Sequence, residues 1–184
     1  MIRGLFILAL AQSLLLPGAL AQEEGDQSGS AEAQAQPQGP RYPCKESENH
    51  RAFDFWVGDW NVTMGGKQAG SNEIKLILGD CVLFENWTGA QGGTGKSFNY
   101  YDRGKGHWRQ IWIDDRGGVI EFTGEVRDGA MYYTATTKTQ DGGTVEHKLT
   151  FSQNEDGSVR QLWDQSSDGG ETWQTVWDGH YVKN

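Results

Sequence analysis

Apolar and polar residues alternate with a period of two along most of the chain, and this pattern constrains the fold more than any other feature. Successive side chains of a β-strand point to opposite faces, so such alternation indicates strands with one buried face. Several connections are turn-formers, such as Asp128-Gly129 and Asp156-Gly157, which favour hairpins and an antiparallel meander. The pattern predicts ten strands, at about 60–64, 74–78, 81–88, 96–101, 107–114, 119–126, 130–138, 144–152, 159–166 and 172–182.

Strands of this kind need to bury one face and to avoid exposed edges. Closure into a barrel meets both needs. We therefore predict an all-β fold, an antiparallel up-and-down β-barrel of about ten strands, with a two-sheet sandwich as the alternative. One short helix is expected just before the first strand, at Ser47–Val57.

The N-terminal residues have the layout of a secretory signal peptide. Arg3 precedes an apolar run at 5–16, and Ala19-Leu20-Ala21 provides small residues for cleavage. The run is shorter than the roughly 20 residues that span a bilayer. We therefore predict a signal peptide at 1–21, no membrane span, and a periplasmic or secreted protein. Residues 22–43 are mainly Gln, Glu, Ala, Gly, Ser and Pro, which favours a disordered linker before a folded domain at 44–184.

Two cysteines, Cys44 and Cys81, occur in the sequence. Because the signal peptide directs them to an oxidising compartment, we expect a disulfide between them. This bond would fasten the start of the domain to a strand.

Charge and motifs exclude several classes of function. With 25 acidic and 16 basic residues the net charge is −9, whereas nucleic acids and anionic membranes are bound by clustered Lys and Arg. We therefore expect no nucleic-acid partner. The four His lack metal-site spacing, and the Asp-rich turns lack the ligand order of an EF-hand loop. No metal and no cofactor are predicted, and His147 is the main candidate should a haem be bound.

The segment SSDGGETW, at 166–173, resembles the Asp-box hairpin of sialidases and other propellers. In such a hairpin the Ser and Asp side chains bind turn amides and the Trp packs beneath them. One copy in a short chain does not make a propeller, in which each blade needs about 40–50 residues. We therefore assign Asp168 and Trp173 a structural role.

The string FDFWVGDW, at 53–60, resembles the start of a family of uncharacterised bacterial secreted proteins with an FDFWxG(E/D)W signature. Further matching positions follow in the same order, among them Asn72, Gly79, Cys81, Glu85, Trp87, Trp108, Gln110, Trp112, Asp114, Asp168 and Trp173. The resemblance covers almost the whole folded unit. It implies a lipocalin-like (calycin) barrel but no settled activity.

Gly58-Asp59-Trp60 also resembles the G-x-W that opens the first strand of lipocalins. There the Trp closes one end of the barrel beneath a basic side chain from the end of the chain. The resemblance implies this structural role for Trp60, with Arg160 or Lys183 as the basic partner.

Alternation also indicates which side chains face the interior. An interior with apolar walls and a few polar groups is typical of a ligand cavity. In 107–114 both faces are equally apolar, so the pattern does not decide which face of this strand points into the barrel. If buried, Glu85 would have a raised pKa and could act as an acid or base, or it could pair with Arg109. The predicted ligand-binding residues are Glu85, Trp87, Trp108, Gln110, Trp112, His147, Gln161 and Trp163.

These features favour a binding protein that holds a small apolar or amphipathic ligand in the barrel. Two alternatives remain at this point. One is a barrel enzyme, such as an isomerase, cyclase or hydrolase, that uses Glu85 and His147. The other is a carbohydrate-binding module that uses exposed Trp faces with Gln and Asp.

Overall fold

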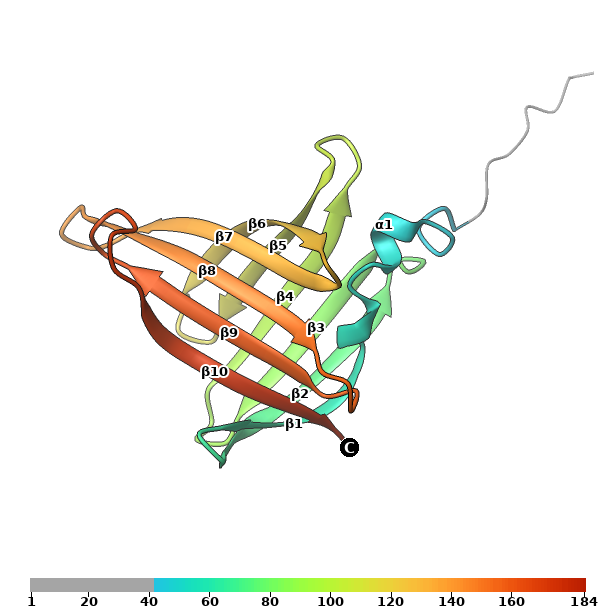
Figure 1. The fold of residues 1–184 in the computed structure, drawn as a ribbon, viewed down its shortest axis with the longest axis horizontal. Coiled ribbons are helices and arrows are strands. Elements are labelled where there is room, and N and C mark those ends of the chain that lie inside the picture. Colours follow the sequence, from blue (N-terminus) through green and yellow to red (C-terminus); the bar gives the residue numbers. More distant parts are fainter. Residues whose placement is uncertain (1–41) are drawn as a thin grey trace, which may run out of the picture. The chain divides into compact units, whose positions relative to one another are not determined.

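The computed structural model describes residues 42–184, so the predicted signal peptide and most of the predicted linker lie outside the described residues. Two short helices precede ten strands (Figure 1). They are α1 (Glu48–Arg51), the 3-10 helix η1 (Asp54–Trp56), β1 (Gly58–Met64), β2 (Lys67–Ile77), β3 (Val82–Gly89), β4 (Thr94–Asp102), β5 (His107–Asp114), β6 (Val119–Arg127), β7 (Ala130–Lys138), β8 (Thr144–Gln153), β9 (Val159–Ser166) and β10 (Gln174–Lys183).

The ten strands form a closed antiparallel barrel in which each strand pairs with its neighbours in sequence. The last strand closes the barrel on the first, with register from Trp60–Lys183 to Met64–Gly179. Figure 1 shows the strands wrapping around a common interior. The barrel prediction is therefore confirmed over the sandwich, since closure leaves no strand edge to protect.

The strand predictions are confirmed apart from the second. Strand β2 begins at Lys67, well before the apolar alternation, because residues 67–73 pair with β1 and β3. Leu78 was expected to continue this strand, and that expectation is wrong. It lies in the turn after β2 with a φ of 54° and is 73% exposed.

The expected helix at Ser47–Val57 is present but consists of two short pieces, α1 and η1. They place Phe53 and Trp56, both completely buried, inside one end of the barrel. The Phe53 ring stacks on Trp56 with centroids 5.1 Å apart, and it meets Trp108 and Phe151 edge-on. The segment before β1 thus fills this end, which we call the packed end.

Trp60 is completely buried at the packed end. Its indole Nε1 donates a hydrogen bond of 2.9 Å to the carbonyl oxygen of Trp56. The Lys183 ammonium lies 5.3 Å from the centre of the indole. Arg160 instead forms an exposed ion pair with Asp178, 2.7 Å between Nε and Oδ1. Lys183 is therefore the basic partner of Trp60.

The Cys44–Cys81 disulfide is confirmed, with Cα atoms 4.9 Å apart. It joins the residues before α1 to the turn between β2 and β3. This link holds the packed-end segment against the barrel.

The Asp-box segment forms the turn between β9 and β10, and its side chains satisfy the turn backbone. Ser166 donates to Asp168 at 2.6 Å, and Asp168 accepts from the Thr172 amide at 3.0 Å. These hydrogen bonds hold the pKa of Asp168 far below its usual range. Trp173 donates to the Gly170 carbonyl, and Lys148 lies 3.6 Å from its ring centre. The motif therefore stabilises the β9–β10 hairpin at the barrel surface.

Candidate functional site

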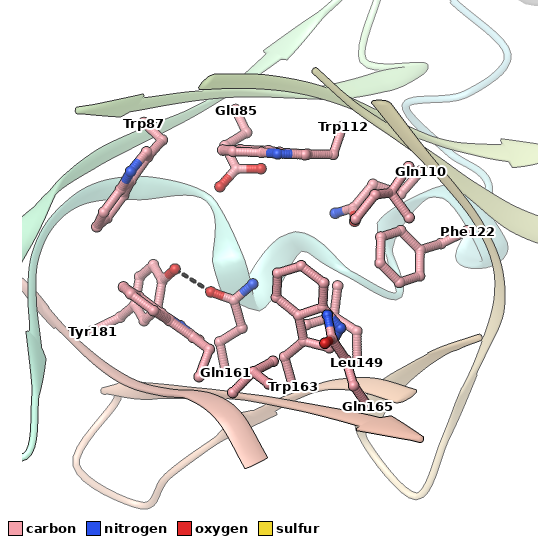
Figure 2. A pocket seen from close by; sticks show the side chains of 13 residues that line it. Glu85, Trp87, Gln110, Trp112, Phe122, Leu149, Gln161, Trp163, Gln165 and Tyr181 are labelled. Carbon is pink, nitrogen blue, oxygen red and sulfur yellow. Dashed lines mark hydrogen bonds between the residues drawn. The ribbon is translucent and has the colours of Figure 1, made fainter. Parts of the chain in front are cut away.

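The opposite end of the barrel contains a cavity of about 270 Å³, and we call this end the hollow end. Strands β3, β5, β6, β8, β9 and β10 supply its walls (Figure 2). The lining residues are Glu85, Trp87, Gln110, Trp112, Ile120, Phe122, Leu149, Gln161, Trp163, Gln165, Val176, Trp177 and Tyr181. In Figure 2, Trp87, Glu85 and Trp112 lie on one side, and Tyr181, Gln161 and Trp163 lie opposite.

Six of the eight predicted binding residues line this cavity together. They are Glu85, Trp87, Gln110, Trp112, Gln161 and Trp163. The structure also settles the inward face of β5, since Trp108 and Gln110 are buried and Trp112 lines the cavity. On the outer face, Arg109 pairs with Glu121 at 3.2 Å. The suggested Glu85–Arg109 pair is therefore wrong.

Trp108 lies outside the cavity lining. It is 2% exposed and belongs to the packed end, where its ring meets Phe53 and Tyr101 edge-on. It points inward like Trp112, but the helical segment already occupies the space beside it.

His147 also points inward and lies behind Trp163, outside the cavity lining. The Trp163 indole donates to His147 Nδ1 at 3.1 Å, and Nε2 lies 2.8 Å from the Thr137 hydroxyl. Because Nδ1 accepts the hydrogen bond from the indole N–H, the neutral ring carries its own proton on Nε2. Burial lowers the pKa of His147, which favours this neutral form. His147 therefore positions Trp163 and does not face Glu85 across the cavity.

Glu85 is the central polar group of the cavity. It is 4% exposed, and Figure 2 shows its carboxylate pointing into the space between Trp87 and Trp112. Its oxygens accept hydrogen bonds from Asn72 Nδ2 at 2.7 Å and from the Ser97 hydroxyl at 2.5 Å. Burial raises the pKa of Glu85 to about 7, and these two hydrogen bonds limit the rise. The carboxyl is therefore poised between its two protonation states near neutral pH.

A second set of buried polar groups extends from Ser97 to the cavity. Asn99 Nδ2 donates to Ser97 Oγ at 2.8 Å, and Gln110 Nε2 donates to Asn99 Oδ1 at 2.7 Å. The Tyr133 hydroxyl donates to the same Asn99 oxygen at 3.3 Å. Because every member has a partner, this network fixes the Gln110 amide and the Ser97 hydroxyl in place.

On the opposite wall the Tyr181 hydroxyl donates to Gln161 Oε1, as drawn in Figure 2. Burial raises the pKa of Tyr181 well above its usual value, and the nearby Glu85 carboxylate adds to the effect. Tyr181 is therefore an uncharged hydrogen-bonding group at neutral pH.

Two of the Trp rings lie against glycines of neighbouring strands. A Cβ atom at Gly95 would lie 2.2 Å from two ring atoms of Trp112, and one at Gly70 would lie 2.6 Å from the ring of Trp87. Only a residue without a side chain permits such close contact. The glycines thus let the rings lie flat along the wall, which leaves the interior open.

Several lining residues were missed in the sequence. Trp177 and Tyr181 share the inward face of β10 with Gly179, and period-two alternation in 174–183 could have found them. Asn72, Ser97 and Asn99 are buried but lie outside the cavity lining. Alternation gave no signal for them, because polar residues in a strand by themselves indicate a solvent-facing side, and Asn72 was named only as a position that matches the secreted family.

The described part of the chain contains no group of three or more His, Cys, Asp or Glu residues placed to hold a metal ion. Within residues 42–184, no helix has the length and apolar character needed to cross a bilayer. A scan against models of protein families and a search of curated proteins found no match to this chain.

Proposed function

We propose that this chain is a secreted or periplasmic binding protein that holds a small apolar or amphipathic molecule in the cavity at the hollow end. The observation that carries the proposal is a cavity of about 270 Å³ with four Trp rings and a few fixed polar groups in its walls. Small-molecule sites are concave, mostly apolar and oriented by a few polar groups, and they typically measure about 300–1,000 Å³. At about 270 Å³, this cavity is slightly smaller than that range, which favours a small ligand.

Two further observations support the proposed compartment and family. The Cys44–Cys81 disulfide is typical of proteins in an oxidising compartment. A closed up-and-down barrel with Trp60 under Lys183 at one end agrees with the lipocalin-like fold that the FDFWVGDW resemblance implies. We keep membership of that secreted family as part of the proposal.

A single observation favours an enzyme as the second candidate. Glu85 faces the cavity with a pKa of about 7, and such a group can accept and return a proton near neutral pH. His147 lies outside the lining, so Glu85 would work without it. The Trp rings line a cavity and do not form an exposed platform, so the carbohydrate-binding alternative gains no support.

Native mass spectrometry of the protein purified from its own host tests the binding proposal. We expect a retained small molecule, and quenching of Trp fluorescence when the neutral apolar probe N-phenyl-1-naphthylamine is added. Trp112→Ala should weaken probe binding, whereas Trp173→Phe, on the outer hairpin, should leave it unchanged. Absence of both a retained molecule and probe binding would contradict the proposal.

The same retained molecule separates binding from catalysis. If the protein converts it, Glu85→Gln should abolish turnover while the protein still binds the probe. If the molecule is recovered unchanged after prolonged incubation, the enzyme candidate fails.

A further inference from the structure

We propose that the ligand is an organic cation, a protonated or quaternary amine carried on a small apolar or aromatic body. This inference rests on the proposed function and narrows its ligand class. Two independent features carry it: the charge of the cavity and the arrangement of its aromatic rings.

The charge of the cavity is one-sided. Among the described residues that line it, Glu85 is the only carboxyl group and none is Lys, Arg or His. A buried ionised group is costly unless a charge of opposite sign accompanies it. An anionic ligand would meet the Glu85 carboxylate with no basic side chain to offset it. A cation would supply the counter-charge that this carboxylate lacks.

The Glu85 carboxylate is already oriented for such a partner. Asn72 and Ser97, on the neighbouring strands β2 and β4 and outside the cavity lining, each donate one hydrogen bond to it. Each carboxylate oxygen can accept more than one hydrogen bond, so capacity remains on the side that faces the cavity. A protonated amine would therefore find a fixed hydrogen-bond acceptor, and a quaternary ammonium, which has no N–H, would find a fixed counter-charge, in both cases without rearrangement of the protein.

The aromatic rings supply the second feature. Cations are attracted to the faces of aromatic rings, most strongly to Trp. Trp87 and Trp112 flank the Glu85 carboxylate, and Trp163 lies across the cavity from it (Figure 2). Trp87 also meets Trp177 at an interplanar angle of 90°, with centroids 5.6 Å apart, which forms an aromatic corner. Because the wall glycines let Trp87 and Trp112 lie flat, these two rings can turn a face to the interior.

This assignment makes binding depend on pH in a defined way. The groups around the Glu85 carboxylate are Asn72 of β2, Ser97 of β4, Tyr133 of β7, and Tyr181 of β10, with Gln161 of β9 opposite. The amides and the hydroxyl of Ser97 do not titrate, and both Tyr pKa values are raised, so among these groups only Glu85 changes charge near neutrality. With a pKa of about 7, the ionised fraction of Glu85 rises about tenfold between pH 6 and pH 8. The affinity for a cation should rise by about the same factor.

Three probes of one shape and different charge test the inference. They are phenyltrimethylammonium, its neutral isostere tert-butylbenzene, and the anion benzenesulfonate. Each is titrated into the wild-type protein at pH 6 and pH 8, with Trp fluorescence and calorimetry as readouts. We expect the cation to bind at least tenfold more tightly than the neutral isostere at pH 8, and the anion not to bind.

Two variants show whether Glu85 is responsible. Glu85→Gln should bring the affinity for the cation to within about threefold of that for tert-butylbenzene and remove the pH dependence. Glu155→Gln, an exposed residue in the β8–β9 turn, removes the same charge far from the cavity and should behave as wild type.

The outcomes distinguish this inference from the proposed function. If tert-butylbenzene or benzenesulfonate binds as tightly as the cation, the organic-cation assignment is wrong and the binding function stands. If none of the three probes binds, the organic-cation assignment is overturned, and the binding function is decided separately by the retained molecule and N-phenyl-1-naphthylamine. The comparison of the three probes in the wild-type protein decides the matter even if Glu85→Gln does not fold.

Discussion

Trp108 and Trp112 lie four residues apart on the inward face of β5, yet they belong to different environments. Trp108 is buried against Phe53 at the packed end. Trp112 lines the cavity at the hollow end, with its ring against Gly95 of the neighbouring strand. The same residue type on the same strand face therefore serves as core in one place and as cavity wall in the other.

The difference comes from what else enters the barrel. At the packed end Phe53, which caps η1, and Trp56 of η1 fill the interior. At the hollow end nothing from the described chain fills the interior, and buried polar groups, chiefly Glu85, face the space instead. Interiors without voids give stability, whereas the proposed binding function requires a preformed cavity such as the one at the hollow end.

Truncation of the two Trp residues in turn tests whether the packed end contributes more packing energy than the hollow end. Trp108→Ala should lower the free energy of unfolding by about 3–5 kcal/mol, since it removes a fully buried ring from a close-packed core. Trp112→Ala should cost about 1 kcal/mol, because its ring faces open space. Urea denaturation of both variants measures the difference. Equal losses would mean that the hollow end contributes as much packing as the packed end.

Removal of the disulfide tests whether the packed-end segment can be loosened without an effect on the hollow end. Replacement of Cys44 and Cys81 by Ser should lower the free energy of unfolding by about 2–4 kcal/mol, because it frees a loop in the unfolded chain. Thermal unfolding measures the loss. Well below the melting temperature, binding of N-phenyl-1-naphthylamine should match that of the wild type. Weakened binding there would show that the two ends are coupled.

Local patterns in the sequence predicted the barrel wall well. Nine strands follow their alternating runs closely, because alternation and Asp-Gly turns are encoded within each hairpin. The start of β2 was missed, since Lys67–Glu73 carry few apolar residues and their strand form depends on pairing with β1 and β3.

The division into two ends could not be predicted in the same way. Trp108 and Trp112 lie in the same local sequence pattern. Whether each ring is core or cavity wall depends on Phe53 and Gly95, which lie elsewhere in the chain. The hydrogen-bond partners of Glu85 could not be predicted for the same reason. Asn72 and Ser97 are distant from each other in sequence, and only the strand register brings both of them to Glu85.

Glu85 makes the stability of the protein depend on pH, because this carboxyl at the hollow end is held in an environment that favours its neutral form. Its folded-state pKa of about 7 lies above the ordinary value of 4.5, so the folded protein binds this proton more tightly than the unfolded chain. The resulting stabilisation is complete below pH 4.5 and is lost as the pH rises through 7. The expected loss is roughly 3 kcal/mol, at about 1.4 kcal/mol per pH unit.

Urea denaturation between pH 4.5 and pH 8 measures this effect in the wild type and in Glu85→Gln. The variant lacks the titrating group, so its stability relative to the wild type should rise with pH across this window. Glu155→Gln should follow the wild type throughout. A stability difference between Glu85→Gln and wild type that does not change with pH would show that Glu85 titrates normally.

The smallest expected effect separates cavity shape from cavity chemistry. Gly95→Ala places a methyl group where two ring atoms of Trp112 now lie 2.2 Å away, so the ring must move into the cavity. We expect a loss of about 1–2 kcal/mol of stability and clearly weaker binding of tert-butylbenzene, because crowding costs energy and the space shrinks. Gly93→Ala is the matched control, since a methyl group there meets open space. Urea denaturation and calorimetric titration measure both variants. If Gly95→Ala behaves like Gly93→Ala, then the flat placement of Trp112 against β4 does not keep the hollow end open.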